Sequence, residues 1–217
     1  MSESHSVIED ELADALPSAV AAQLRDLGLA CNAGSLAYRQ ALLVEEQAGQ
    51  VFEATRDTDP AVLFRRLVAD EHTDIGLSVT EQFLATYAVA AASYATFATT
   101  VLAATMSGRL QDVEPMTPVM PSVLLADPDG LLPVVDLPSS LVDNELVERL
   151  RRGRERVMAA ASNARASGVA GCYDGHSAAL ARPDDAVELD EDVPSGLHAY
   201  AVLLLEALDP LVAEPRA

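Results

Sequence analysis

The sequence predicts a mainly α-helical fold, a bundle of about four to six helices with a proline-rich extended segment packed across it. Apolar residues recur at spacings of three, four and seven over most of the chain, as in amphipathic helices. Residues 82–108 contain no charged side chain, which is typical of a helix enclosed by others. Residues 114–138 hold six prolines, too many for a long helix. We therefore expect a bundle over residues 1–113, an apolar connector over 114–139, and over 140–217 a long arginine-bearing helix, an acidic loop and a C-terminal helix that pack on the bundle.

The first two helices are expected over residues 17–29 and 36–55. Gly28 or Gly34 would end the first helix, and Ser35 would cap the second. The apolar residues of the second helix fall largely on one face, as in an amphipathic helix. They are Leu36, Leu43, Val44, Val51 and Phe52.

Two further start signals place the third and fourth helices. Asp59 followed by Pro60 pairs an N-cap acceptor with a first-turn proline, and the helix would run to about residue 71. Ser78 and Glu81 fit a capping box, which begins the long uncharged helix, and Gly108 would end it. Hydroxyl side chains in that helix can bond to the carbonyl four residues back, so they require no ligand.

The connector is too apolar for a solvated linker. We interpret it as extended chain packed across the bundle, or as a short hairpin around residues 127–130. Its apolar surface would otherwise be a binding site for a partner. Beyond it, Ser140 and Asp143 mark the start of a helix over residues 141–166. A loop over 168–195 and a last helix over 197–208, ended by proline, complete the chain.

The charge composition limits the function. The chain carries 34 acidic and 14 basic residues, for a net charge of −20, and all of the basic ones are arginine. General nucleic-acid binding is not expected, because phosphate affinity depends on cations. The lack of lysine excludes Schiff-base chemistry, a P-loop lysine and a Ser–Lys dyad. This balance is typical of salt-adapted proteins, because concentrated salt screens the self-repulsion, and we expect the fold to loosen at low ionic strength.

We expect a cytoplasmic location, because residues 1–5 are polar and show no start of a secretory signal. The alternative is a membrane-associated helical protein that uses residues 82–108 as its span. That stretch is rich in Ala, Thr and Ser, which contribute little transfer energy. A core helix is therefore favoured over a span.

Five of the fourteen arginines fall within eight residues. Arg149, Arg152 and Arg156 share one helix face, which would bind a phosphate, an RNA backbone or an acidic partner. The other interpretation is pairing within the chain, with nearby glutamates and with the acidic segment 184–192. Gly153 in the middle of the cluster indicates a close contact with backbone.

Two residue sets define a metal-binding or enzymatic alternative. Glu46 and Glu53 share a helix face, and His72 follows a further acidic pair, but the Glu-x-x-His pairs of di-iron bundles are absent. Cys172 and His176 lie in a glycine-containing loop and would form a metal-ligand pair or a nucleophile pair. Neither set completes a known pattern, so we expect no cofactor.

No phosphate loop, dinucleotide fingerprint or nucleophile elbow occurs in the sequence. We therefore predict a protein-interaction or regulatory and structural module rather than an enzyme. Its partner is expected to be another protein, with self-association as a further option. The predicted interaction surfaces are the connector and the arginine-bearing helix.

Overall fold

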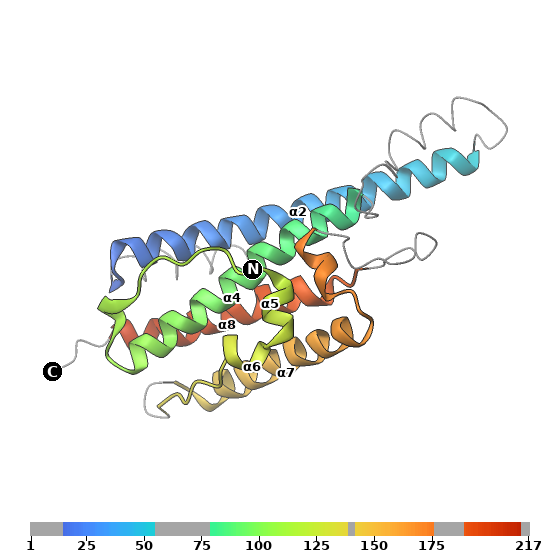
Figure 1. Cartoon of the computed structure of the whole chain (residues 1–217). Helices are drawn as coiled ribbons and strands as arrows, with labels where there is room; N and C mark the ends of the chain where they lie inside the picture. Colours follow the sequence, from blue (N-terminus) through green and yellow to red (C-terminus); the bar gives the residue numbers. More distant parts are fainter. Residues whose placement is uncertain (1–14, 55–78, 139–141, 176–188, 214–217) are drawn as a thin grey trace.

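The computed structural model describes residues 15–54, 79–138, 142–175 and 189–213 (Figure 1). Within these ranges every regular element is a helix, six of them α-helices, so the predicted mainly α-helical class is confirmed. The expected helix over residues 60–71 and the capping residue Ser78 lie outside the described residues.

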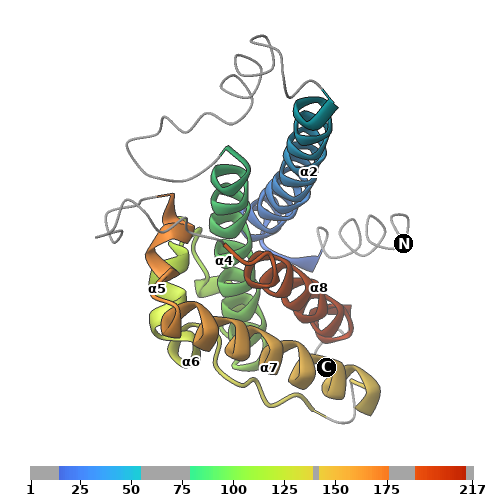
Figure 2. The same cartoon turned by 90° about the vertical axis from the view of Figure 1, so that its right-hand side faces the viewer.

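The long helix α4 (Val79–Met106) forms the centre of the molecule. Helices α2 (Ser18–Ala54) and α8 (Asp192–Ala213) pack along it, and α7 (Asn144–Ala166) packs on α8 (Figures 1 and 2). Nearly every side chain of α4 between Leu84 and Leu102 is buried. Since neighbours cover this helix on several sides, a charged residue there would lose its hydration without a partner. The packing thus accounts for the uncharged sequence.

Two described helices have the length and apolar composition of a membrane span, Thr80–Met106 and Asp192–Val212. In the first, 67% of the most apolar stretch is buried inside the protein, and in the second 39%. Core helices of bundles share this composition, so the cytoplasmic location stays a prediction.

One continuous helix, α2, replaces the first two expected helices. Neither Gly28 nor Gly34 ends it, and Ser35 lies in its middle rather than at a cap. A Cβ added to Gly34 would lie 3.0 Å from Cα of Tyr87 in α4. The expected break was wrong because this glycine permits close helix packing, a role that the sequence does not distinguish from chain termination.

The connector packs across the bundle, partly as short helices. After η1 (Leu110–Asp112) the chain is irregular until α5 (Pro121–Ala126) and α6 (Pro128–Leu131), each of which begins with a proline. Asp127 caps α6 by accepting a hydrogen bond of 3.1 Å from the Gly130 amide. The hairpin expected at this turn is therefore wrong, because the Asp-Pro pair begins a helix instead.

Residues 113–120, which we call the strap, are held by side chains of α2 and α4. The side-chain amide of Gln23 donates a hydrogen bond of 2.7 Å to the carbonyl of Met116 and accepts one of 2.9 Å from the Met116 amide. A neighbouring β-strand would make the same pair of backbone bonds. The hydroxyl of Ser93 accepts a bond of 2.9 Å from the amide of Val119. The strap is thus attached by polar contacts in addition to its apolar side chains.

Helix α7 ends at Ala166, as expected, but it begins at Asn144, three residues after the expected start. Asp143 caps it by accepting a 2.6 Å bond from the Leu146 amide, and Gly168, with φ of 73°, follows its end. Ser140, the other residue of the expected start signal, lies outside the described residues. Helix α8 begins five residues before the expected start and continues past Pro210, where we expected it to end. Pro194 lies in the first turn, where no amide hydrogen is needed, and Pro210 disturbs only the last turn.

Candidate interaction surface

The arginine cluster of α7 is largely paired within the chain. Arg149 Nη1 lies 2.9 Å from Oε2 of Glu206 on α8. Arg154 donates to the carbonyl of Leu132 at 2.7 Å and pairs with Oδ1 of Asp129 at 2.6 Å, so it attaches α7 to the connector. These two arginines position helices relative to one another.

The remaining arginines of the cluster lie on the outer side of α7. Arg151 pairs with Glu148 at 2.9 Å and with Glu155. Arg152 donates to the carbonyl of Glu148, and Arg156 is exposed and forms no ion pair with a residue that the structure describes. Of the three predicted partner-binding arginines, only Arg152 and Arg156 make no hydrogen bond or ion pair to another helix in that part of the chain.

The residues of the metal alternative are not brought together by the described structure. Glu46 is exposed on α2, Glu53 lies in the last turn of that helix, and the side chain of Glu53 is outside the described part. Cys172 is buried in η2 (Ala170–Asp174), whereas His72 and His176 lie outside the described residues. In the ranges that the structure covers, no group of three or more His, Cys, Asp or Glu residues could hold a metal ion.

Both cysteines are buried thiols. Burial raises the pKa of Cys31 to about 12. The pKa of Cys172 is raised by burial and by the nearby carboxylates of Glu81 and Asp174. The protonated form therefore dominates at neutral pH, which opposes a nucleophilic role for either sulfur.

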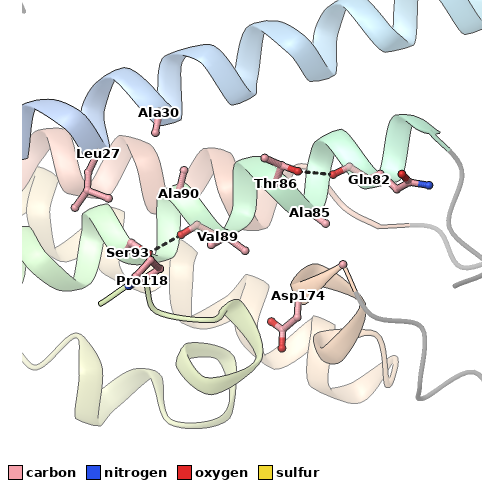
Figure 3. Close-up of a pocket in the computed structure, with 11 residues that line it drawn as sticks. Leu27, Ala30, Gln82, Ala85, Thr86, Val89, Ala90, Ser93, Pro118 and Asp174 are labelled. Carbon is pink, nitrogen blue, oxygen red and sulfur yellow. Dashed lines mark hydrogen bonds between the residues drawn. The ribbon is translucent and has the colours of Figure 1, made fainter. Parts of the chain in front are cut away.

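A groove of about 530 Å³ lies between α2 and α4, next to the strap (Figure 3). Thr86 donates to the carbonyl of Gln82 at 2.9 Å, and Asp174 accepts from the amide of Ser122 at 2.9 Å and from its hydroxyl. In Figure 3 the Asp174 carboxylate points away from α2. These polar groups are already engaged, so the groove offers mainly apolar contact. Its apolar walls are Leu27, Ala30, Ala85, Val89, Ala90 and Pro118.

The outer face of α2 carries an exposed row of leucines, which we call the leucine stripe: Leu29, Leu36 and Leu43. Their exposed fractions are 59%, 58% and 56%. Residues seven apart lie on one face of a helix, so the three side chains form one line. The buried residues Val20 and Cys31 lie on the opposite side, toward the core. Helix α2 is therefore apolar on two faces, and the bundle covers only one of them.

The sequence places Leu36 and Leu43 on one apolar face of a helix, and the structure leaves this face exposed. Periodicity finds both apolar rows of α2, but it does not say which row the rest of the chain covers. The signal in the sequence that would have identified the stripe is the presence of two rows of apolar residues on opposite faces of one helix. A surface helix that packs on the core through one face has only one such row.

The leucine stripe lies on a surface of low net charge in a chain of net charge −20. Between residues 18 and 47, α2 carries two arginines and three carboxylates, which are Arg25, Arg39, Asp26, Glu45 and Glu46. Glu45 accepts a bond of 2.6 Å from the hydroxyl of Thr80, at the start of α4. This part of α2 thus differs from the strongly acidic average of the protein.

Two further exposed apolar residues of α2, Leu42 at 39% and Val44 at 52%, lie beside the end of the stripe. The remaining exposed large apolar residues of the described part are scattered. They are Phe83, Val123, Val134 and Val147, at exposures of 37–69%. Single exposed apolar residues are normal on protein surfaces, whereas a continuous row on one helix indicates a contact surface.

Comparison of the chain with protein-family models, with curated proteins and with solved structures finds no match. The function is therefore argued from the surface itself.

Proposed function

We propose that this chain is a protein-interaction module, and that the outer face of α2 binds an α-helix of a partner. The leucine stripe supports this proposal more than any other feature. Three leucines spaced by seven match the core row of a two-helix coiled coil. Addition of a partner strand would need free backbone groups, which the middle of a helix does not offer.

The energetic case rests on apolar burial. More than half of each leucine side chain is exposed, and covering it would contribute about 1–2 kcal/mol per residue. Exposed leucines lower solubility, and the described part of the chain leaves these three mostly uncovered. An interaction that covers them accounts for both the spacing and the exposure.

Arg152 and Arg156 are a second candidate surface, for an acidic partner, because they are exposed and not bonded to another helix in the described part. Salt distinguishes the two surfaces. Binding through arginine weakens as salt screens the charges, whereas binding through leucines persists or strengthens.

Site-specific photo-crosslinking tests the proposal. The photoreactive amino acid p-benzoylphenylalanine is placed at Leu36 and, as a matched control, at Val134, which is 69% exposed on the connector. Ultraviolet irradiation in an extract of the source cells is expected to give a covalent protein adduct from position 36 and none from position 134. Mass spectrometry then identifies the attached helix.

The proposal is wrong if position 36 gives no adduct or if both positions give the same adducts. The adduct is also expected to disappear when Leu29 and Leu43 are both changed to Glu, since this removes the apolar row. Both positions are exposed, so the fold is retained.

A further inference from the structure

We infer that the helix bound by the leucine stripe is α2 of a second copy of this chain, lying antiparallel to the first. This inference rests on the proposed function, since it names the partner of the same surface. The observations that carry it are the residues on either side of the stripe.

The stripe defines a heptad register along α2. With the leucines at position d, the a positions of the seam are Asp26, Ala33, Gln40 and Gln47. The small side chain of Ala33 allows a large leucine to pack opposite it. The other a positions are polar, so the apolar contact of the seam comes from the leucines at d, from Ala33 and from the methylene groups of the two glutamines.

One flank of the seam carries charge and the other does not. The g positions are Arg25, Asn32, Arg39 and Glu46, and the e positions next to the leucines are Ala30, Ala37 and Val44. In an antiparallel pair the two g flanks face each other. The flanks that carry the charged side chains of the two copies therefore lie side by side along the seam.

A single antiparallel register makes this flank complementary. When Leu36 packs against Ala33 of the second copy, Arg25 faces Glu46 of that copy and Asn32 faces Arg39. Shifting the register by one heptad in one direction brings Arg39 against itself. Shifting it in the other direction brings Arg25 against Arg39, which is also repulsive.

A parallel pair is disfavoured by the same residues. It would place Asp26 of one copy against Asp26 of the other within the seam, and it would leave the g flank opposite an uncharged e flank. The antiparallel pair has no such like-charge contact in the seam, because Asp26 lies opposite Leu43 of the second copy, in the outer part of the seam.

The exposed geometry of α2 permits this pairing. Leu29, Leu36 and Leu43 point away from α4, and in Figure 1 the C-terminal end of α2 extends beyond the start of α4. The seam from residue 22 to 47 is about 38 Å long at 1.5 Å per residue. A strip of this length about one helix wide is smaller than the ~800 Å² per partner typical of stable complexes, so we expect a concentration-dependent dimer.

Sedimentation velocity on the purified chain, over a range of concentrations at one fixed KCl concentration, tests the pairing. The wild type is expected to shift from monomer to dimer. Arg25→Glu and Glu46→Arg should each weaken the dimer about tenfold, because each replaces two symmetric attractions by repulsions. The double variant Arg25→Glu/Glu46→Arg should recover the wild-type affinity to within about threefold.

Asn32→Glu gives an independent test. It places a carboxylate opposite Arg39 of the second copy, so the dimer should tighten about threefold although the chain gains a negative charge. The matched control Asn32→Arg should weaken it. Arg25, Asn32 and Glu46 are all exposed, so none of these changes removes core packing.

The self-pairing is wrong if the wild type remains monomeric at every concentration, if the charge-swapped double variant is no tighter than the single variants, or if Asn32→Glu weakens the dimer. A monomeric wild type together with a Leu36 adduct to a different protein would reject the self-pairing and retain the proposed function. The absence of any Leu36 adduct would reject both.

Discussion

Two glycines of this protein, Gly34 and Gly153, allow helices to pack closely because glycine has no side chain. Gly34 lets α2 approach the backbone of Tyr87, and Gly153 lets α7 approach α8, where an added Cβ would lie 3.1 Å from Leu203. The sequence predicted a close contact at Gly153 and a helix break at Gly34. Both are contact points inside helices, so the loss in helix propensity is offset by closer packing.

We expect Gly34→Ala to destabilise the protein by about 1–3 kcal/mol, because the new methyl group overpacks the contact with Tyr87. The matched control is Gly196→Ala in α8, where the nearest atom, in Val157, would lie 3.9 Å from the added Cβ. This change should stabilise the protein by about 0.5–1 kcal/mol through helix propensity. Urea denaturation measures both changes, and equal effects at the two sites would contradict the packing argument.

The hydroxyl residues of α4 have individual roles. Ser93, Thr99, Thr100 and Thr105 donate to the carbonyl four residues back, as the sequence predicted. Thr96 is the buried exception, because its hydroxyl has no hydrogen-bond partner in the part of the chain that the structure describes. The presence of Ser or Thr in a helix therefore predicts a hydrogen bond to the carbonyl four residues back, but it does not predict which hydroxyl lacks this bond.

At the scale of elements, the strap depends on a small number of polar contacts. Gln23 of α2 and Ser93 of α4 bond to the strap at two points, and the connector then passes into α5 and α6. Arg154 holds the end of α6 to α7 through Leu132 and Asp129. Polar side chains of three helices thus fix a segment that proline prevents from forming a long helix.

Ser93→Ala is expected to destabilise the protein by about 1–2 kcal/mol and to speed amide exchange at Val119, because that amide loses its acceptor. Thr96→Val is the matched control on the same helix. It removes a buried hydroxyl without a partner, so stability should be unchanged or about 1 kcal/mol higher. Hydrogen exchange with denaturant titration measures both, and slow exchange at Val119 in Ser93→Ala would contradict the role given to Ser93.

At the scale of the whole molecule, the net charge of −20 dominates the response to salt. The described ion pairs join groups that are mostly exposed, so they add little stability. Repulsion among the excess carboxylates acts over about 10 Å in 0.1 M salt and about 3 Å in 1 M salt. Salt adaptation stays a prediction of the composition.

We expect the free energy of unfolding to rise with KCl concentration between dilute buffer and molar salt, because screening reduces repulsion more in the compact state than in the unfolded chain. Chemical denaturation with urea, an uncharged denaturant, measures this without changing the ionic strength. A midpoint that does not move with KCl would contradict salt adaptation.

Stability should also fall in alkaline solution. Burial raises the pKa of Cys31 from 9.0 to about 12 and the pKa values of Tyr87 and Tyr173 from 10.0 to about 12. Below about pH 8 these groups are protonated in both states. Above it the unfolded chain ionises first, so stability is lost as the pH rises toward 12. Urea midpoints at pH 8 and pH 11 test this, and equal midpoints would contradict it.

Several features followed from the sequence alone because they depend on local chemistry. The helical class follows from apolar periodicity, the presence of α7 from the polar start signal that includes Asp143, and the close contact from Gly153. The sequence also located the proline-rich segment, because proline excludes a long helix there.

Tertiary structure alone decided the rest, because these features depend on which surfaces meet. It joined the first two expected helices through the contact of Gly34 with Tyr87, and it paired Arg149 with Glu206 and Arg154 with Asp129. It also covered one apolar row of α2 and left the leucine stripe exposed. A sequence records that a helix has two apolar faces, but only the packing of distant segments determines which face remains to bind a partner.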